Sequence, residues 1–401
     1  MDSLTAEFFE SLAQTSAVPS GLVIRSAKGC WITDAEGGSY LDWLAGISVL
    51  NTGHCHPKVV SALVGQAQKY LHTMVYGEYV QESQVLLAAA LKSLVPIGDA
   101  RVFFTSSGAE AVEGALKLAR KHTGRKGFAA FEGSYHGDTF GALAVTGSAG
   151  MRGPFEPLPG PVKFLPFGPT RDLGWIDRET AAVIVEPIQA EGGVVVPPGD
   201  FLPALRKRCD ETGALLIADE IQTGLGRTGM PWGCSLSGVT PDVMVLAKAV
   251  GGGLPLGAFI APAGIMKTLS ENPPLSHLTT FGGHPLSCAA GLAALKVTLE
   301  ENLQENASEL GEIMIRTFSG LLKTGLVEGV SGKGLLIGVK MKSPAAAEGL
   351  VSRCRERGLL IGTALHDERV IRITPPLIMS DEEMVRGLEI FAAALADSGG
   401  R

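Results

Sequence analysis

Apolar residues in the N-terminal part of this chain recur with the period of a helix. Their spacing predicts a helix over about 2–15 and two amphipathic helices over about 57–71 and 82–94. Between the first two lies the turn Asp34–Gly38, whose flanking residues predict short strands. This part of the chain is therefore expected to mix helices with short strands.

From Arg101 onwards, short apolar runs alternate with helical segments, of which 109–122 and 200–212 are the clearest. Apolar runs separated by helices are typical of a mostly parallel sheet with both faces covered. The chain is therefore predicted to have an α/β fold with helices on both faces of a central sheet. The predicted strands are Val102–Thr105, Phe128–Phe131, Val183–Glu186, Leu215–Ala218, Val243–Leu246 and Ala258–Ala261.

After Gly283 the pattern becomes helix-rich to about 323 and then predicts a small α+β domain. Because no low-complexity linker separates the two parts, we expect them to share a wide interface. We assign 51–285 to a large ligand-binding domain, 286–401 to the small domain, and 1–50 to an N-terminal segment of that small domain. The late elements are strands Leu335–Met341 and Val370–Thr374 and helices near 345–357 and 381–396.

The composition narrows the classes of function. Of the 401 residues, 45% are hydrophobic and 19% charged, which supports a large core and excludes a disordered chain. The net charge is −7 without a basic face, which argues against nucleic acid as a partner. No apolar run reaches the ~18 residues of a membrane span, and the N-terminus lacks signal-peptide features. Six scattered cysteines are typical of reduced thiols, so we expect a cytoplasmic protein.

Lys248 stands just after the predicted strand Val243–Leu246 and just before the glycines Gly251–Gly253. One interpretation is a lysine at the sheet edge whose charged end reaches water. The other is an amine desolvated enough to lose its proton and act as a nucleophile, as a Schiff-base lysine must. The local pattern alone leaves both interpretations open.

Asp219 and Glu220 follow the strand Leu215–Ala218, at the carboxyl end where open α/β sheets bind ligands. Pyridoxal phosphate (PLP) needs an acid beside its pyridine nitrogen, and Asp219 fits that role. The 29 residues from Asp219 to Lys248 allow one crossover to a neighbouring strand. The alternative for Asp219 is a carboxylate that caps a helix N-terminus.

A small polar turn, Ser106–Ala109, connects a predicted strand to a predicted helix. Free backbone N–H groups at such a junction bind phosphate, although a simple well-capped helix explains the same pattern.

Two other motifs suggest different ligands, but their signals are weaker. Gly224, Gly226 and Gly229 match the dinucleotide fingerprint, but the Pro-rich and Gly-rich residues that follow exclude the helix it requires, so we reject NAD binding. His54-Cys55-His56 has no further ligand at metal spacing, so a structured turn is favoured over zinc.

Together these residues resemble the class III (ω-) aminotransferases, which are PLP-dependent transferases of fold-type I. The resemblance covers nearly the whole chain, from Gly53–Pro57 to Ile371–Pro376. Its most specific segment is Ala218–Gly229 followed by Lys248. It implies a PLP enzyme that moves amino groups, working as a homodimer with two shared sites.

The resemblance also implies a role for each matching residue. Lys248 would carry PLP as a Schiff base and move the proton during transfer, and Asp219 would pair with the pyridine nitrogen. Gln222 would contact the phenolic oxygen, and Thr280 would reach the phosphate of the partner subunit's cofactor. The remaining cofactor-binding residues would be Ser107, Gly108 and Ala109 at the phosphate, Tyr135 stacked on the ring, and His136 and Glu186.

Glu191 and Arg372 carry the implied substrate class. In ornithine-type members of the family, the matching glutamate neutralises the matching arginine when an ω-amine binds. The arginine is released to form a bidentate pair with the α-carboxylate of glutamate or 2-oxoglutarate. The pair therefore predicts a donor with a terminal amine and 2-oxoglutarate as acceptor. A purely structural ion pair is the alternative.

Two departures from the family pattern weaken an amino-acid donor. Asp138 stands where acetylornithine and ornithine enzymes have a carboxylate-binding arginine, and Ile47 stands where ornithine enzymes have tyrosine. Both changes favour diamines such as putrescine, because an acid repels carboxylates. Three alternatives stay open on the same fold: a diaminopelargonate-type aminotransferase, a glutamate-semialdehyde-type aminomutase, and a non-catalytic PLP-fold protein.

Overall fold

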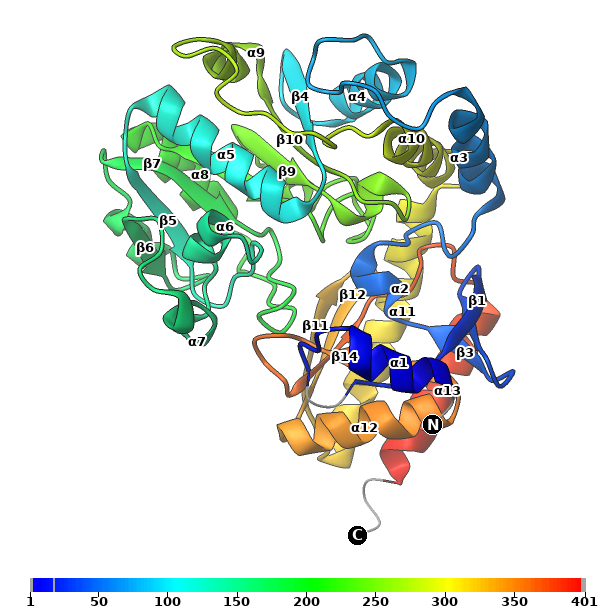
Figure 1. Cartoon of the computed structure of the whole chain (residues 1–401). Coiled ribbons are helices and arrows are strands. Elements are labelled where there is room, and N and C mark those ends of the chain that lie inside the picture. The colour runs from blue at the N-terminus through cyan, green and yellow to red at the C-terminus, as the bar shows by residue number, and fades with distance from the viewer. Residues whose placement is uncertain (1–2, 17–18, 398–401) are drawn as a thin grey trace.

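The computed structural model describes residues 3–16 and 19–397, which form a larger and a smaller body with separate cores (Figure 1). The first helix, α1, covers Ser3–Ser11, whereas the sequence predicted about 2–15. The residues after Ser11 are exposed and have no core to pack against, so the helix ends early, and residue 2 lies outside the described residues. Within the described ranges, every helix is too short or too polar to cross a lipid bilayer.

A seven-stranded sheet forms the centre of the larger body and confirms the predicted α/β fold. Its neighbours are parallel except for β10, which runs antiparallel to both β4 and β9. The strand β6 was not predicted, because it is a short edge strand with a lysine and only one buried residue. In spatial order the strands are β4 (Ala100–Thr105), β10 (Gly257–Pro262), β9 (Val243–Leu246), β8 (Leu215–Asp219), β7 (Thr180–Val185), β5 (Gly127–Phe131) and β6 (Val162–Leu165).

Helices cover both faces of this sheet, as the apolar runs predicted. In β7, Ala182 and Ile184 pack into the core beneath α5, whereas Val183 and Val185 pack into the core beneath α8. This two-residue alternation lets a fully apolar strand serve two cores at once. The helices of the larger body are α3 (Pro57–Lys69), α4 (Glu82–Leu94), α5 (Gly108–Thr123), α6 (Phe140–Val145), α7 (Ala149–Arg152), α8 (Phe201–Thr212), α9 (Ala263–Met266) and α10 (Pro285–Glu300).

The smaller body joins the two ends of the chain. The strand β13 (Leu359–Leu360) pairs in parallel with β3 (Ser39–Asp42). Trp43 is fully buried in the same core as Phe318 and Phe391. These contacts support the proposed assignment of residues 1–50 to the small domain. The proposed start of the small domain at 286 stays a prediction, but α10 packs against α3 and α4 and is therefore described with the larger body. The other elements here are β1 (Ile24–Lys28), β2 (Trp31–Asp34), α2 (Ala45–Ser48), α11 (Leu303–Gly320), β11 (Val327–Lys333), β12 (Leu336–Met341), α12 (Pro344–Glu356), β14 (Gly362–Thr363), β15 (Val370–Ile373) and α13 (Asp381–Ala396).

Candidate active site

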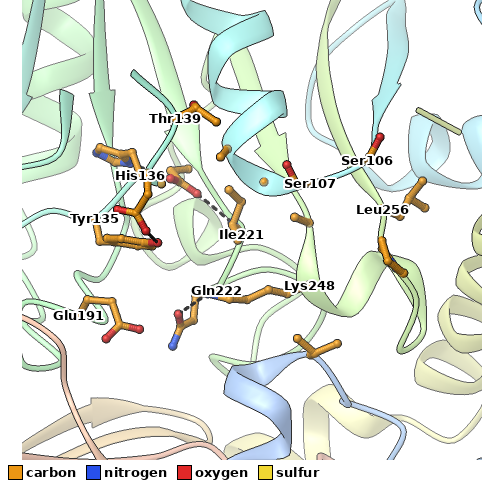
Figure 2. A pocket seen from close by; sticks show the side chains of 18 of the residues that line it. Ser106, Ser107, Tyr135, His136, Thr139, Glu191, Ile221, Gln222, Lys248 and Leu256 are labelled. Carbon is orange, nitrogen blue, oxygen red and sulfur yellow. Dashed lines mark hydrogen bonds and ion pairs between the residues drawn. The ribbon is translucent and has the colours of Figure 1, made fainter. Parts of the chain in front are cut away.

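A cavity of about 630 Å³ opens where β8 and β9 end and α5 begins (Figure 2). The carboxyl ends of parallel strands meet at one edge of a sheet, so residues from distant parts of the chain line the same space. Nearly all of the predicted site residues line this cavity. They are Ser107, Gly108, Ala109, Tyr135, His136, Asp138, Glu186, Glu191, Asp219, Gln222 and Lys248.

Lys248 projects into the cavity from the turn that follows β9. Its backbone is left-handed, with φ of 49°, which is unusual for a residue with a side chain. The Nζ atom donates to Gln222 Oε1 at 2.6 Å. Burial lowers the pKa of Lys248, and the nearby Arg372 lowers it further, while Glu191, Asp219 and Glu186 act in the opposite direction. The shift favours the neutral amine, which is the nucleophilic form.

Asp219 and Glu220 are adjacent at the end of β8 but point to different places. Asp219 Oδ2 lies 2.7 Å from His136 Nδ1, and Asp219 Oδ1 accepts from the Ile221 N–H at 3.1 Å. Glu220 turns away and accepts from the backbone N–H groups of Gly233 and Cys234, each at 2.7 Å. Only Asp219 therefore faces the cavity, whereas Glu220 holds the following loop in place.

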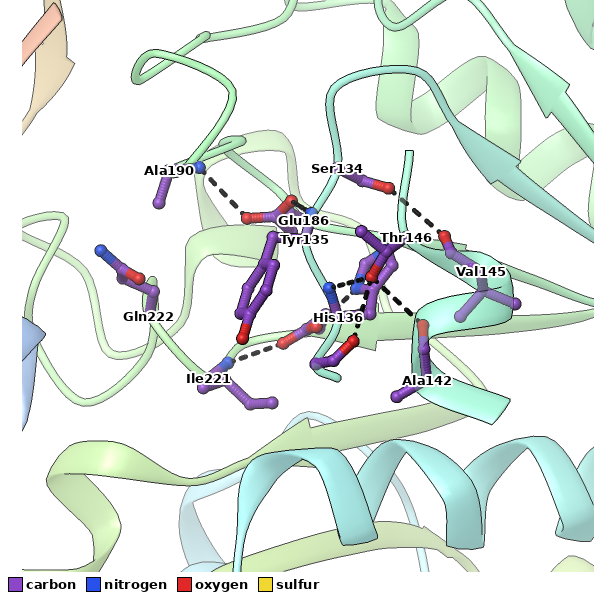
Figure 3. Close-up of polar contacts among 12 residues, drawn as sticks. Ser134, Tyr135, His136, Ala142, Val145, Thr146, Glu186, Ala190, Ile221 and Gln222 are labelled. Atoms are coloured by element: carbon purple, nitrogen blue, oxygen red, sulfur yellow. Dashed lines mark hydrogen bonds and ion pairs between the residues drawn. The ribbon is translucent and has the colours of Figure 1, made fainter. Parts of the chain in front are cut away.

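Glu186 is buried behind Tyr135, directly after β7 (Figure 3). Its carboxylate accepts from the backbone N–H groups of Tyr135 at 3.0 Å and Ala190 at 3.1 Å. Burial raises the pKa of Glu186 to about 7, His136 opposes this shift, and Asp219 adds to it. Glu186 therefore positions the Tyr135 segment through the backbone and does not point its own charge at the cavity centre.

Tyr135 and Asp138 form the outer wall of the cavity. The Tyr135 hydroxyl donates to Asp138 Oδ2 at 2.8 Å. Burial raises the pKa of Tyr135, and the hydrogen bond to Asp138 raises it further. The hydroxyl therefore stays protonated at neutral pH, and the exposed Asp138 carboxylate lies at the mouth of the cavity.

The turn before α5 combines both interpretations of its sequence. Ser107 caps the helix, because its Oγ atom accepts from the Glu110 N–H at 3.2 Å. The first-turn N–H groups of Gly108 and Ala109 have no carbonyl partner within the helix and line the cavity. A side chain at position 108 would lie 2.8 Å from Ile221, so glycine permits this close approach. The turn is thus a capped helix that also offers N–H donors to an anion.

Glu191 and Arg372 form an ion pair between the two bodies of the protein. Both side chains are largely buried, at 7% and 4% exposed, and Glu191 Oε2 also accepts from the Leu365 N–H at 3.0 Å. Arg372 Nε has no hydrogen-bond partner among the described residues. Glu191 lines the cavity that holds Lys248, so the ion pair connects this cavity to the smaller body.

Three predicted residues, Ile47, Thr280 and Arg372, do not line this cavity, although Arg372 pairs with Glu191, which does. Ile47 is 49% exposed, and Val49 lines the cavity instead. Thr280 lines a second cavity of about 420 Å³, and Ser106 lines both cavities.

An apolar segment, Leu254–Leu256, also lines the Lys248 cavity and was not predicted from the sequence. Its signal was the glycine run before it, which turns the chain back over the site.

The residues present fit PLP. Gln222 Nε2 is a buried donor with no partner among the described residues, and it sits beside Lys248, where a phenolic oxygen would lie. Asp219 offers a carboxylate on the adjacent strand, and the α5 turn offers N–H groups to a phosphate. The cavity volume lies within the range of small-molecule sites. Anion donors, a nucleophilic amine and an acid thus surround one space.

Comparison with known proteins identifies relatives over nearly the full length. The family model for aminotransferase class-III matches residues 12–395. The acetylornithine aminotransferase of Methanosarcina acetivorans is 44% identical over 376 residues, which cover 93% of this chain and 91% of that protein. The ornithine aminotransferase of Toxoplasma gondii ME49 has a TM-score of 0.92 at 32% identity, covering 99% of this chain and 96% of that one. An ω-transaminase from Pseudomonas jessenii, solved in complex with PMP, has a TM-score of 0.91 at 26% identity, covering 99% of this chain and 98% of that one.

The raised pKa of Glu186 predicts a pH-dependent cost to stability. Between its ordinary value of 4.5 and about 7, the unfolded chain has released this proton while the folded protein keeps it. The carboxyl therefore destabilises the fold progressively as pH rises through that window. We expect Glu186→Gln to gain thermal stability relative to the parent from pH 5 to 7, with a constant difference above that. Thermal unfolding of both proteins across this range measures it, and a difference independent of pH would contradict the assignment.

Proposed function

Because the chain belongs to the class-III aminotransferase family, we propose that it transfers the terminal amino group of a diamine or ω-amino acid to 2-oxoglutarate. The family confirms the expected enzyme class, fold-type I and PLP dependence. The finer proposal rests on one observation: Glu191, which lines the Lys248 cavity, forms a buried ion pair with Arg372, and both charges act on Lys248. An aldehyde and glutamate would be the products.

Each residue at the reaction centre has a task that its surroundings support. PLP, when bound, supplies an electrophilic carbon for the amino group and a ring that accepts electrons as a C–H bond breaks. Lys248 anchors the cofactor, and its lowered pKa suits an amine that takes and returns a proton at the substrate carbon. Asp219, which pairs with His136, would place its carboxylate at the pyridine nitrogen. Gln222 would offer its free amide N–H to the phenolic oxygen.

The Glu191–Arg372 pair supports alternation between two substrates. With the pair closed, the guanidinium charge is neutralised and the substrate end of the cavity accepts an uncharged chain or an amine. With Glu191 turned away, Arg372 offers two parallel N–H donors to the α-carboxylate of 2-oxoglutarate or glutamate. A buried ion pair that opens for a carboxylate exchanges one charge partner for another, which avoids leaving Arg372 unpaired.

The charges around the cavity support a donor without a free carboxylate at its far end. Among the described residues that line it, Lys248 is the single lysine or arginine. Asp138 adds a negative charge at the mouth, where a second amino group would be attracted. The curated relatives are named acetylornithine aminotransferases, which supports an ω-amine donor of that size. The charge at the mouth favours the diamine member of this class.

A screen of the first half-reaction tests the proposal. We expect putrescine to bleach the cofactor absorbance of the PLP-loaded enzyme, with N-acetylornithine, ornithine, 4-aminobutyrate, lysine and cadaverine as the comparison set. Added 2-oxoglutarate should restore the absorbance and yield glutamate in proportion to donor, which an aminomutase would not do. Lys248→Ala should abolish turnover, because the amine and its proton transfer are both lost. A colourless protein, or a Lys248→Ala variant with unchanged spectrum and turnover, would overturn the proposal.

Asp138→Arg is expected to change the donor preference. The substitution replaces a negative charge at the cavity mouth with a cation that can pair with a carboxylate. We expect kcat/KM to fall for putrescine and rise for N-acetylornithine, changing their ratio by about tenfold or more. Asp138→Asn is the matched control and should give a smaller change in the same direction. If N-acetylornithine is already the best donor of the parent, or the ratio is unchanged, Asp138 does not select the donor.

We further propose that the enzyme is a homodimer with shared sites. A group of apolar side chains is exposed on α3, α4 and the neighbouring loops; Val80 is 93% exposed, and Leu71, Tyr79, Leu275 and Phe281 are all above half. Patches of this kind mark protein interfaces. Thr280 lies in the same region and lines a neighbouring cavity, not the Lys248 cavity of its own chain. The six cysteines are free, which fits the cytoplasmic location expected from the sequence.

Light scattering on the purified enzyme is expected to give about twice the 41.8 kDa of one chain. Thr280→Ala should weaken PLP binding by about tenfold, the usual cost of one lost hydrogen bond to a charged group. Thr279→Ala, one residue earlier, is the matched control, since its hydroxyl accepts from the Gly282 N–H within the chain. A monomer with full PLP affinity and activity would contradict the shared-site proposal.

A further inference from the structure

The glycine motif that resembles a dinucleotide fingerprint forms the junction between the two bodies of the protein. Gly226 and Gly229 both have positive φ angles, of 90° and 81°. A side chain on Gly226 would lie 3.3 Å from Leu377, and one on Gly229 would lie 3.0 Å from Ser308 on α11. The glycines therefore let the loop after Gln222 approach the smaller body closely.

Arg227, in the middle of this motif, is fully buried. Its Nη1 atom donates to the carbonyl oxygens of Leu335 at 3.0 Å and Pro375 at 2.6 Å, and its Nη2 atom donates to Asn51 Oδ1 at 2.8 Å. No carboxylate pairs with it in the part of the chain that the structure describes. Burial lowers the pKa of Arg227 to about 9, so the guanidinium still carries its charge at neutral pH.

A buried arginine that bonds only neutral acceptors is costly, which suggests that its geometry is needed. Further bonds reinforce the junction. The Leu335 N–H donates back to Arg227 O at 3.0 Å, Asn51 Nδ2 donates to Leu225 O at 3.0 Å, and the Leu377 N–H donates to Asn51 O at 2.7 Å. The planar guanidinium thus ties three chain segments together at fixed angles.

These three segments frame the strand that carries Arg372. Leu335 directly precedes β12, and β12 pairs with β15 so that Gly338 lies opposite Arg372. Pro375 follows Arg372 by three residues, just after the end of β15. At the opposite end of the motif, Gln222 precedes Arg227 by five residues and bonds Lys248. Arg227 therefore stands between the residue that holds the lysine and the strand that holds the carboxylate-binding arginine.

We propose that Arg227 is a positioning residue that sets the distance between Arg372 and Lys248, and thereby the recognition of the dicarboxylate substrate. The proposal rests on the proposed function, in which Arg372 binds the α-carboxylate of 2-oxoglutarate. A donor amine makes no use of Arg372, so its half-reaction depends less on this junction. The three bonds of the Arg227 guanidinium, to Leu335, Pro375 and Asn51, form a clamp. Its loss would displace β15 and weaken carboxylate binding more than amine binding.

The test compares Arg227→Lys with Arg208→Lys in the PLP-loaded enzyme. Arg208 on α8 also donates to backbone carbonyls, of Ile176 at 2.6 Å and 2.9 Å, but within the larger body alone. Lysine keeps the charge at either position and loses the fork. We expect Arg227→Lys to raise the KM for 2-oxoglutarate, and the Kd of the inert dicarboxylate glutarate, by about tenfold. The rate of the donor half-reaction should change by less than about threefold, and Arg208→Lys should leave all three unchanged.

Equal losses in both half-reactions, or the same pattern in Arg208→Lys, would show a merely structural role and overturn the proposal. If Arg227→Lys does not fold, Asn51→Ala removes the bonds of the Asn51 side chain to Arg227 and to Leu225 and should shift glutarate binding in the same direction. Unchanged binding would then overturn the proposal. Arg372→Lys distinguishes a failure of the proposed function from a failure of the Arg227 inference. If it leaves 2-oxoglutarate binding unchanged, the proposed function fails and the inference with it. If it weakens binding while Arg227→Lys does not, the clamp alone fails.

Discussion

A lysine amine held out of water at the end of β9 is the constraint that the rest of the site depends on. An amine in such a place loses its proton more readily, but only while acids nearby do not restore it. Here burial and Arg372 lower the pKa of Lys248, and three carboxylates work against them. Two of those carboxylates are already engaged, Asp219 with His136 and Glu191 with Arg372. The third, Glu186, has its own pKa raised to about 7, which reduces its charge near neutral pH. The site therefore keeps a reactive amine because its acids are paired or close to neutral.

Much of the fold follows from local sequence pattern. The six predicted strands of the large sheet all exist, because strands covered on both faces consist of continuous apolar runs. The strands β6 and β11 were missed, since each is mostly exposed or half-buried and so lacks that signal. The strands β13 and β14 were missed because each has only two residues. The length of α1 was also wrong, because helical periodicity does not reveal whether a partner surface exists.

Some residues of the site could also be predicted from local sequence pattern, and others could not. Lys248, Asp219 and the turn before α5 were predictable, because each follows a strand and the carboxyl ends of parallel strands converge. The ion pair between Glu191 and Arg372 joins residues 181 positions apart, and only the family resemblance pointed to it. Asp219 and Glu220 point to different sides, as adjacent residues at the end of a strand do, and the sequence analysis assigned only Asp219 to the site. The partners of Glu220 were not foreseeable. They are backbone donors from a loop that no local pattern places.

The reversed strand β10 has a consequence for the shape of any ligand. It lies between β4, which leads to the anion-binding turn, and β9, which leads to Lys248. Adjacent strands are about 4.8 Å apart, so the turn and the lysine stand roughly two strand spacings, or about 10 Å, from each other along the sheet edge. Asp219 lies on β8, one spacing beyond the lysine. The sheet therefore fixes the spacing of three groups, the turn before α5, Lys248 and Asp219. It would accept a flat molecule that presents an anionic arm, a reactive carbon and a basic ring atom to them in that order.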